Sequence, residues 1–252
     1  MLFRSWKVAE RCHEEGATFT LTNAPVALRM GAINDLAAKC NAQVIGADAT
    51  SIEDLENLFT QSQEILGGKI DFVLHSIGMS PNVRKGKMYT DLDYDYYHKT
   101  VDISAMSLHK TLQTAMRIDA ISEWGSVVAL SYIAAQRVFP DYGDMADAKS
   151  LLESITRSFG YHYGKAKKVR INTISQSPTK TTAGQGVKGF DGFYNYADAM
   201  SPLGNASAES CADYCLTLFS DYTKMVTMQN LFHDGGFSFT GVSKEVMEKY
   251  AG

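Results

Sequence analysis

Three segments that resemble buried strands, the first of them a near-continuous apolar run, are separated by segments of helical pattern and constrain the fold of this chain most strongly. They are KIDFVLHSIG (69–78), GSVVALSY (125–132) and KVRINTIS (168–175). A strand that is apolar along its whole length is typical of a parallel sheet covered on both faces, because a solvated face would alternate apolar and polar residues. We therefore expect a parallel sheet at the centre of the molecule.

The rest of the chain alternates between helix and strand signals. Ser51 is expected to cap the helix that it precedes, since acidic residues follow it in the first turn. The pattern predicts one α/β domain over 1–252, of the doubly wound Rossmann type, and this length requires no second domain. Helices are expected at 6–16, 29–41, 51–68, 92–123, 142–164 and 207–220, and shorter strands at 18–22, 42–48 and 228–236.

Composition and charge exclude several classes of function. The net charge is −4, from 24 basic and 28 acidic residues, so nothing indicates a nucleic-acid partner. No apolar run is long enough to span a membrane, and no signal peptide is recognisable. The four cysteines show no metal-ligand spacing, so we expect no metal and reduced thiols, as in the cytoplasm.

The stretch 177–205 lacks a regular apolar pattern and is rich in glycine. Loops of this length are uncommon in compact domains and typically form lids or binding segments. Its aromatic residues Phe190, Phe193, Tyr194 and Tyr196 offer surface for packing, which argues against a disordered insertion. We predict a substrate-binding lid here.

A tyrosine and a lysine seven residues apart follow the apolar run at 125–132. Tyr142 and Lys149 lie in a segment predicted to be helical, and two turns take about 7.2 residues, so both side chains are expected on one face. A nearby ammonium group favours the phenolate and eases proton transfer. Tyr132 ends the preceding strand, where open α/β sheets place their ligands. Because such a spacing also arises by chance in many helices, the position after the strand carries the argument.

These residues resemble a known family. The Tyr-x6-Lys arrangement, with Tyr132 ten residues before Tyr142, is similar to that of bacterial enoyl-acyl-carrier-protein reductases, a branch of the short-chain dehydrogenase/reductase superfamily. Ordinary members of the superfamily use Tyr-x3-Lys, but Ala146 stands at that closer position. The resemblance runs from about residue 6 to the end and includes ADAT (47–50), HSIGMSP (75–81), RINTISQSPTKTTAG (170–184) and HDGGFS (233–238).

The resemblance implies roles for the residues of the site. Tyr142 would stabilise the enolate oxygen of a thioester. Lys149 would bind the nicotinamide ribose and support the tyrosine. Tyr132 would contact the substrate, and the backbone near Ser80 would face it.

The implied cofactor is NADH. The segment TNAP (22–25), which follows a predicted strand, has neither the acidic residue that favours NAD nor a basic pair for a 2′-phosphate. The absence of a basic pair, together with the habit of the family, favours NADH. The cofactor-binding residues implied by the resemblance are Ala24, Asp48, Ala49, Ser76, Ile77, Gly78, Lys149, Thr179, Lys180, Thr181, Thr182 and Ala183.

The implied reaction is NADH-dependent reduction of the trans-2 double bond of an enoyl chain on acyl carrier protein, in bacterial fatty acid biosynthesis. The enzyme would be a homotetramer. Its carrier protein is acidic, so Arg84, Lys85 and Lys87 are candidates for docking it, although a solvated charged loop explains them equally well.

The N-terminal end departs from the family. The chain starts inside a helix, whereas the resemblance implies a preceding strand, placed between 18–22 and 71–76, and a glycine-containing turn that binds pyrophosphate. Either the sequence is an incomplete copy of a functional enzyme, or it is a short form that has lost dinucleotide binding. The first is favoured because native folds rarely leave central strand edges unpaired. About 17 to 20 family-like residues added in front are expected to strengthen NADH binding.

Two other functions therefore stay open. A ketoreductase of the wider superfamily would reduce a ketoacyl substrate, although the Tyr-x6-Lys spacing argues against it. A non-catalytic remnant would act only as an oligomerisation or binding partner, and its support comes solely from the N-terminal end.

Overall fold

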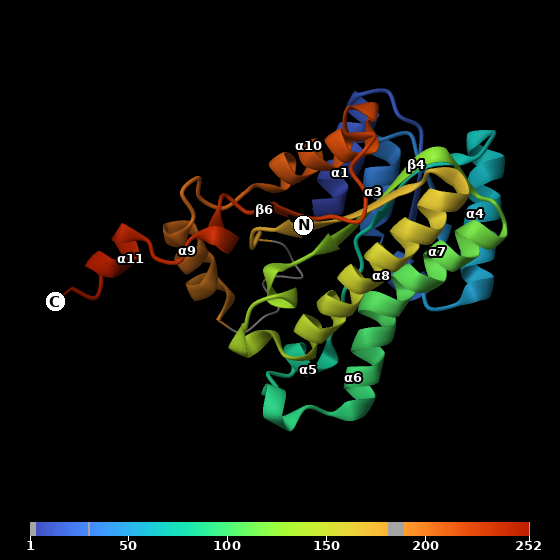
Figure 1. The fold of residues 1–252 in the computed structure, drawn as a ribbon. Helices are drawn as coiled ribbons and strands as arrows, with labels where there is room; N and C mark the ends of the chain where they lie inside the picture. The colour runs from blue at the N-terminus through green and yellow to red at the C-terminus, as the bar shows by residue number, and fades with distance from the viewer. Residues whose placement is uncertain (1–3, 30, 181–188, 252) are drawn as a thin grey trace.

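The computed structural model describes residues 4–29, 31–180 and 189–251, and a parallel four-stranded sheet lies at its centre (Figure 1). Neighbouring strands pair in the order β3-β4-β5-β6, and each pairing is parallel. This confirms the sheet expected from the apolar runs. The strands are β3 (Ile70–His75), β4 (Ile121–Ser131), β5 (Arg170–Gln176) and β6 (Asn230–His233).

The two middle strands, β4 and β5, are the most deeply buried. Every residue of β5 is buried, and so is every residue of β4 from Gly125 onward. Each strand is paired along both edges, so its backbone hydrogen-bonding groups are satisfied within the sheet. Burial on both faces explains why the second half of β4 is mainly apolar without strict alternation. In β5, by contrast, only Ile171 and Ile174 are apolar.

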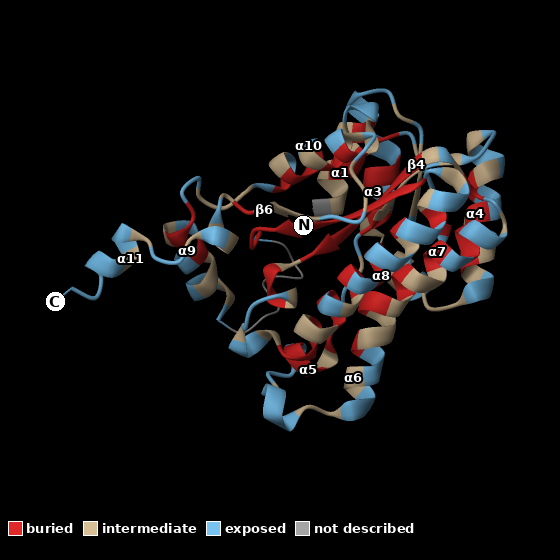
Figure 2. Ribbon diagram, in the orientation of Figure 1, coloured by how far each residue is buried: buried red, intermediate tan, exposed pale blue. Residues whose placement is uncertain are grey.

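Helices cover both faces of this sheet (Figures 1 and 2). On one face lie α7 (Ser107–Arg117) and α8 (Asp144–Lys167), and on the other lie α1 (Arg4–Glu14) and α10 (Ala208–Phe219). Successive residues of β4 serve the two faces in turn, as the period of a strand requires. Val127 thus belongs to the first core and its neighbour Val128 to the second.

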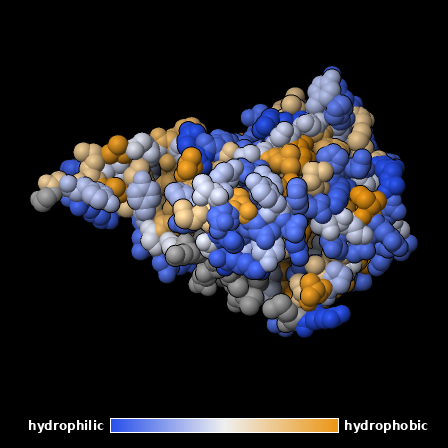
Figure 3. Space-filling model, turned by 90° about the horizontal axis from the view of Figure 1, so that it is seen from below, coloured by the Kyte–Doolittle hydropathy of each residue, from blue (hydrophilic) through white to orange (hydrophobic). Residues whose placement is uncertain are grey.

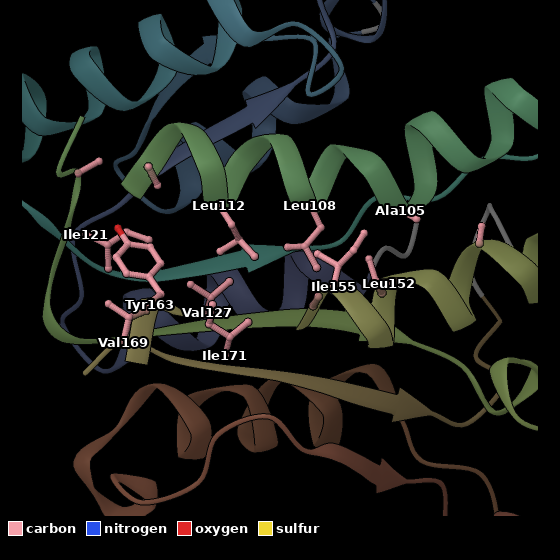
Figure 4. Packing of buried hydrophobic residues seen from close by; sticks show 14 of the residues in the cluster. Ala105, Leu108, Leu112, Ile121, Val127, Leu152, Ile155, Tyr163, Val169 and Ile171 are labelled. Atoms are coloured by element: carbon pink, nitrogen blue, oxygen red, sulfur yellow. The ribbon is translucent and has the colours of Figure 1, made fainter. Parts of the chain in front are cut away.

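The larger core lies between α7, α8 and the sheet (Figure 4). Leu108 and Leu112 of α7 meet Leu152 of α8 above Val127 and Ile171, and all five are completely or almost completely shielded from solvent. This core fixes α8 on the sheet, and α8 carries much of the site described below.

The remaining helices follow local signals. Ser51 caps α4 as predicted, because its hydroxyl oxygen accepts the N–H of Asp54 at 3.2 Å. Gly67 ends the same helix with φ +75°, a conformation that favours glycine. The remaining α-helices of the described residues are α2 (Pro25–Leu28), α3 (Ala32–Lys39), α4 (Ile52–Leu66), α5 (Pro81–Arg84), α6 (Tyr94–Val101), α9 (Phe190–Met200) and α11 (Lys244–Glu248).

Two predicted segments differ from the structure. The long helix expected at 92–123 consists of α6 and α7, joined by a π-helical turn at Asp102–Met106. The stretch 177–205, predicted as a loop, contains the helix α9, whose Ala197 and Met200 are buried. The glycine content hid this helix, because glycine lowers helix propensity while packing of a few apolar residues sustains it. Residues 181–188 of the predicted lid lie outside the described residues.

The two N-terminal strands stand apart from the main sheet. β1 (Thr20–Asn23) and β2 (Gln43–Gly46) form a parallel pair of their own. Among the described residues, β1 and β3 are not hydrogen-bonded to each other. The further strand that the resemblance implies between these two strands stays a prediction.

The C-terminal residues project from the body of the molecule (Figure 1). α11 contacts α9 and extends outward, with Phe239, Val242 and Tyr250 exposed. The view from below shows hydrophobic atoms along this projection, at the left of Figure 3. Such exposed apolar side chains are typical of surfaces that meet another protein.

Candidate active site

Lys149 of α8 joins three elements at the carboxyl end of the sheet. Its side chain is buried, with 6% of the residue exposed, and its ammonium group donates to the carbonyl oxygen of Leu130 at 2.8 Å. The same group lies 3.4 Å from the carbonyl oxygen of Ile77. Leu130 is near the end of β4, and Ile77 belongs to the loop that follows β3. The lysine therefore places a positive charge where parallel α/β sheets bind their ligands.

Gly78 lines the approach to this lysine. A Cβ atom at this position would lie 2.8 Å from the terminal methyl group of Met145 and 3.8 Å from Lys149 Nζ. A side chain at this position would therefore have to displace the end of Met145 and would come into contact with the lysine. Ser76 and Gly78 are exposed and Ile77 is half-buried, so this segment forms an open rim beside a cation. The arrangement fits a ribose and nicotinamide, which would bring hydroxyl groups to the ammonium group.

Tyr142 reaches the site by a route that the sequence did not predict. It lies in a 3₁₀ turn at Pro140–Tyr142, and α8 begins only at Asp144. Gly143 separates the two with φ +47°, which interrupts the helical path. The prediction that one helix face carries Tyr142 and Lys149 is therefore wrong in its geometry. The tyrosine is placed instead against Tyr132, with ring centroids 5.1 Å apart.

Tyr132 is the centre of an aromatic cluster. Its ring contacts Phe139 at 5.5 Å and Phe193 of α9 at 6.3 Å, measured between centroids. Phe193 also packs edge to face on Phe139 at 5.1 Å and on Phe237 at 6.0 Å. The predicted lid segment thus supplies an aromatic ring next to the tyrosine pair. These rings form apolar surface beside the polar groups of the site.

Ser80 turns its side chain away from this surface. Its hydroxyl donates to Asp144 Oδ1 at 2.6 Å, and its oxygen accepts the N–H of Val83 at 3.0 Å, which caps α5. Only the backbone of Ser80 remains for the predicted contact with substrate. This inward orientation could not be predicted, because a serine before proline is equally typical of a helix cap and of a binding loop.

Two buried side chains near Lys149 escaped the sequence reasoning. Glu153, one turn further along α8, accepts hydrogen bonds from Ser131 Oγ at 2.7 Å and from Gln136 Nε2 at 3.0 Å. Asp144 accepts two others, described below. Glu153 lies four residues after Lys149 and Asp144 five residues before it. This spacing could have indicated buried polar groups, because a charged side chain on the covered face of a helix needs a hydrogen-bonding partner.

His75 is the third such residue, and it ends β3. Its Nε2 lies 2.8 Å from Ser107 Oγ, whose hydrogen is donated to the carbonyl oxygen of Ile103. The imidazole therefore donates from Nε2 to Ser107. Complete burial, followed by the nearby charge of Lys149, lowers the pKa of His75 to about 3. The residue is neutral at physiological pH and helps to hold the loop that contains Ser76 to Gly78.

Three residues that the resemblance implies for cofactor binding lie at the ends of β1 and β2, and the resemblance places two of them, Asp48 and Ala49, at the adenine. Ala24 donates its N–H to Asn23 Oδ1 at 2.9 Å and directly precedes α2, while Asp48 and Ala49 follow β2. The N–H of Ala47 bonds to the carbonyl oxygen of Asn23 at 3.0 Å, so the carboxyl ends of β1 and β2 lie side by side. Asp48 Oδ1 accepts hydrogen bonds from the N–H and the hydroxyl of Thr50. One oxygen of this carboxylate is therefore already used within the turn that follows β2.

The residues after β5 are described only in part. Thr179 is nearly buried, and its hydroxyl lies 3.3 Å from the carbonyl oxygen of Ser177. The ammonium group of Lys180 lies 4.5 Å from the ring centroid of Tyr194 in α9. This contact joins the start of the predicted lid segment to α9. Thr181, Thr182 and Ala183 lie outside the described residues.

Within the described ranges, no three or more His, Cys, Asp or Glu side chains come together as a group that could hold a metal ion. In the same ranges, none of the helices has both the length and the apolar character that crossing a membrane requires.

Known proteins share this sequence and fold. A family model described as enoyl-(acyl carrier protein) reductase matches residues 5–238. The chain is 31% identical over 240 residues to enoyl-[acyl-carrier-protein] reductase [NADH] 1 of Rhizobium meliloti, which covers 94% of this chain and 86% of the relative.

Solved structures agree with this relationship. FabI from Alistipes finegoldii is 63% identical, with a TM-score of 0.94 over 98% of this chain and 90% of that one. A FabI–NADH complex from the same organism is 66% identical, with a TM-score of 0.96 over 98% and 87% of the two chains. Because the family model spans most of the sequence and the site has the expected groups at the carboxyl end of the sheet, the chain belongs to the enoyl-acyl-carrier-protein reductases of the short-chain dehydrogenase/reductase superfamily.

Proposed function

We propose that this chain reduces the trans-2 double bond of an enoyl group carried on acyl carrier protein, in fatty acid biosynthesis. NADH, when bound, supplies the hydride that adds to the β-carbon of the substrate. Membership of the family supports this reaction, as do the names of the relatives and the NADH complex of a similar chain. The observation that carries the proposal is the buried ammonium group of Lys149 between the Gly78 rim and β4, on the same strand end as the tyrosine pair.

The residues of the site have different roles in binding and catalysis. Lys149 binds the hydroxyl groups of the ribose and adds positive charge near the reacting groups. Tyr142 donates a hydrogen bond to the thioester oxygen as negative charge develops there, which lowers the barrier because the donor is held in place beforehand. Tyr132 contacts the acyl thioester beside Tyr142. The backbones of Ser76, Ile77 and Gly78 form one wall of the cofactor groove.

The acyl chain is proposed to lie against the aromatic cluster. Tyr132, Phe139, Phe193 and Phe237 present rings from the segment that follows β4, from α9 and from the C-terminal segment. An acyl chain that leaves water for such a surface gains about 0.8 kcal/mol per buried methylene group. The segment 177–205 then acts as the lid over the substrate, with α9 as its structured part.

The docking site for acyl carrier protein is proposed near α5. Arg84 is exposed, whereas Lys85 lies over the ring of Tyr96 and Lys87 pairs with Asp91 at 3.3 Å. Arg84 is therefore the strongest of the three candidates, because within the described part of the chain its guanidinium group has neither a salt bridge nor a ring contact to lose. An acidic partner would be attracted to this surface at low salt.

A homotetramer is proposed as the assembled form. The outer side of α7 and α8 bears a groove of about 750 Å³, lined by His109, Met116, Leu151, Ile155 and Phe159, among others. This groove lies away from the strand ends, so it does not serve the reaction itself. Two such helix pairs can pack against each other in a symmetric interface. None of the four cysteines forms a disulfide within the described residues, which supports a cytoplasmic location.

One assay tests the proposed reaction. The purified chain is mixed with NADH and either a crotonyl thioester or a ketoacyl thioester, and the loss of NADH absorbance is followed. We expect oxidation that depends on the crotonyl substrate and is faster than with the ketoacyl substrate. Faster turnover of the ketoacyl thioester would indicate a ketoreductase. No turnover of either would favour the non-catalytic binding role.

A further inference from the structure

Asp144, the first residue of α8, has a buried carboxylate that the proposed reaction does not use. The residue is completely shielded from solvent. Its Oδ1 accepts the hydroxyl of Ser80 at 2.6 Å, and its Oδ2 accepts the amide of Asn82 at 2.8 Å. Burying a carboxylate is strongly unfavourable unless hydrogen bonds replace its water. The two donors and the first turn of the helix supply that replacement.

The two donors belong to a wider network. Asn82 also donates to the carbonyl oxygen of Asp93 at 3.0 Å and accepts the N–H of Asp93 at 3.1 Å. Asp93 in turn caps α6. Asp144 therefore connects the start of α8 with α5 and with the start of α6, entirely through buried or half-buried polar groups.

The same network holds the loop that lines the cofactor groove. Ser80 follows Met79, whose N–H donates to Ser104 Oγ at 2.9 Å and whose carbonyl oxygen lies 3.1 Å from the same hydroxyl. Ser104 belongs to the π-helical turn between α6 and α7. π-helical turns often occur at functional sites because they re-aim side chains. Ser104 and Asp144 thus fix the end of the 76–80 loop from two directions.

Tyr142 lies two residues before this anchor and outside α8. Its N–H bonds to the carbonyl oxygen of Phe139 within the 3₁₀ turn. Gly143, the only residue between Tyr142 and Asp144, adopts φ +47° and packs near Val83 and Leu92. The carbonyl oxygen of Gly143 accepts the N–H of Ala146 at 3.2 Å, so the turn with Tyr142 joins α8 directly beside the point at which Asp144 is fastened to the 76–80 loop and α5.

We infer that Asp144 is a positioning residue for Tyr142, and that it fixes the phenol relative to the 76–80 loop. The inference rests on the proposed role of Tyr142 in enoyl reduction. Small displacements of a catalytic group lower the rate strongly, because the donor must be in place before charge develops. Lys149 has separate anchors at Leu130 and Ile77, so it should keep its position when Asp144 is changed.

A double-mutant cycle with Tyr142→Phe tests the inference. Asp144→Asn keeps the size of the side chain but presents an amide N–H₂ to one of the two donors, so one arm of the network must break. With Tyr142 present, we expect kcat to fall about 10-fold while the Kd for NADH changes less than about 2-fold. In the Tyr142→Phe background, the same change is expected to lower kcat by less than about 2-fold, because the positioned phenol is absent.

Asp147→Asn is the matched control. Asp147 lies one turn along α8, and its carboxylate accepts hydrogen bonds from the hydroxyls of Tyr89 at 3.0 Å and Tyr97 at 3.1 Å. The same substitution there should leave kcat within about 2-fold of the wild type. If Asp144→Asn does not fold, as judged by circular dichroism, Asn82→Ala replaces it in the cycle. That variant removes one arm only, and its smaller loss of kcat should also vanish with Tyr142→Phe.

The cycle separates two kinds of failure. Equal losses of kcat with and without the phenol would overturn the positioning role while leaving the proposed function intact. An unchanged kcat for Asp144→Asn in the presence of Tyr142 would do the same. If Tyr142→Phe alone did not lower kcat, the role of Tyr142 in the proposed function would be wrong, and the positioning role would fall with it.

Discussion

The middle strands β4 and β5 and the N-terminal strands β1 to β3 show two ways to build a parallel sheet. β4 and β5 are paired along both edges and are almost wholly buried. β1, β2 and β3 are paired along one edge within the described residues, and several of their side chains are half-exposed. The groups proposed for catalysis depend on the first region. The groups proposed for adenine and for the groove wall depend on the second.

This difference indicates that chemistry and cofactor binding have separate structural supports. Lys149 and Tyr132 are held by a strand that cannot shift without disturbing the core. Asp48, Ser76 and Gly78 lie in turns at the ends of strands with fewer neighbours. A substitution in one region should therefore affect turnover and affinity in a different ratio from a substitution in the other.

The largest expected effect compares Lys149→Ala with Tyr142→Phe. Lys149 contacts both regions, through Leu130 and Ile77, so its loss should lower kcat/KM about 1000-fold and weaken NADH binding about 10-fold. Tyr142→Phe should lower kcat about 100-fold and leave NADH affinity within about 2-fold. Steady-state kinetics and calorimetry measure both quantities. Lys165→Ala, an exposed lysine on α8, is the control. A Lys149→Ala enzyme with wild-type affinity for NADH would contradict the assigned role.

The second effect concerns stability. Ile171→Ala in β5 removes a completely buried side chain and should lower the free energy of unfolding by about 3 to 4 kcal/mol. Ile70→Ala in β3 removes a half-buried side chain, and the cost should be only about 1 to 2 kcal/mol. Denaturant unfolding of the two variants provides the comparison. Equal losses would show that the edge strand is as tightly packed as the middle one.

The third and smallest effect is a dependence on pH at the end of β3. The pKa of His75 is about 3 in the folded chain and close to its ordinary value of 6.5 when unfolded. As pH falls below 6.5, the unfolded state binds a proton that the folded state does not, so stability decreases. This residue should cost about 2 kcal/mol between pH 7.5 and 5.

His75→Gln tests this dependence, because it removes the titrating group and keeps a hydrogen-bond donor. Unfolding free energies of the wild type and of the variant are compared at both pH values. The acid-induced loss should be smaller in the variant by about 2 kcal/mol. Parallel pH profiles for the two proteins would mean that His75 is not buried in its neutral form.

Much of the architecture could be predicted because burial leaves a direct record in the sequence. The strands expected at 69–78, 125–132 and 168–175 correspond to β3, β4 and β5, and Ser51 caps its helix as its side chain suggested. The chain lengths between these runs allow only crossover connections through helices. These features depend on local composition, so one sequence suffices to predict them.

The details that escaped prediction depend on contacts between distant segments. The spacing of Tyr142 and Lys149 suggested one helix, but Gly143 places the tyrosine in a separate turn. The network around Asp144 joins residues more than sixty positions apart. α9 forms inside a glycine-containing stretch because its few apolar residues are buried by other parts of the chain. No periodicity within one segment records such contacts.

The two buried carboxylates of α8 have a mechanical consequence. Asp144 fastens the loop after β3, and Glu153 fastens the loop after β4, to a single helix. The two attachment points are about 13 Å apart along the helix axis, at 1.5 Å per residue. An α-helix of this length hardly stretches. The loops after β3 and β4, which form the two walls of the groove, are therefore attached to one rigid helix, and we expect thermal motion to move them together.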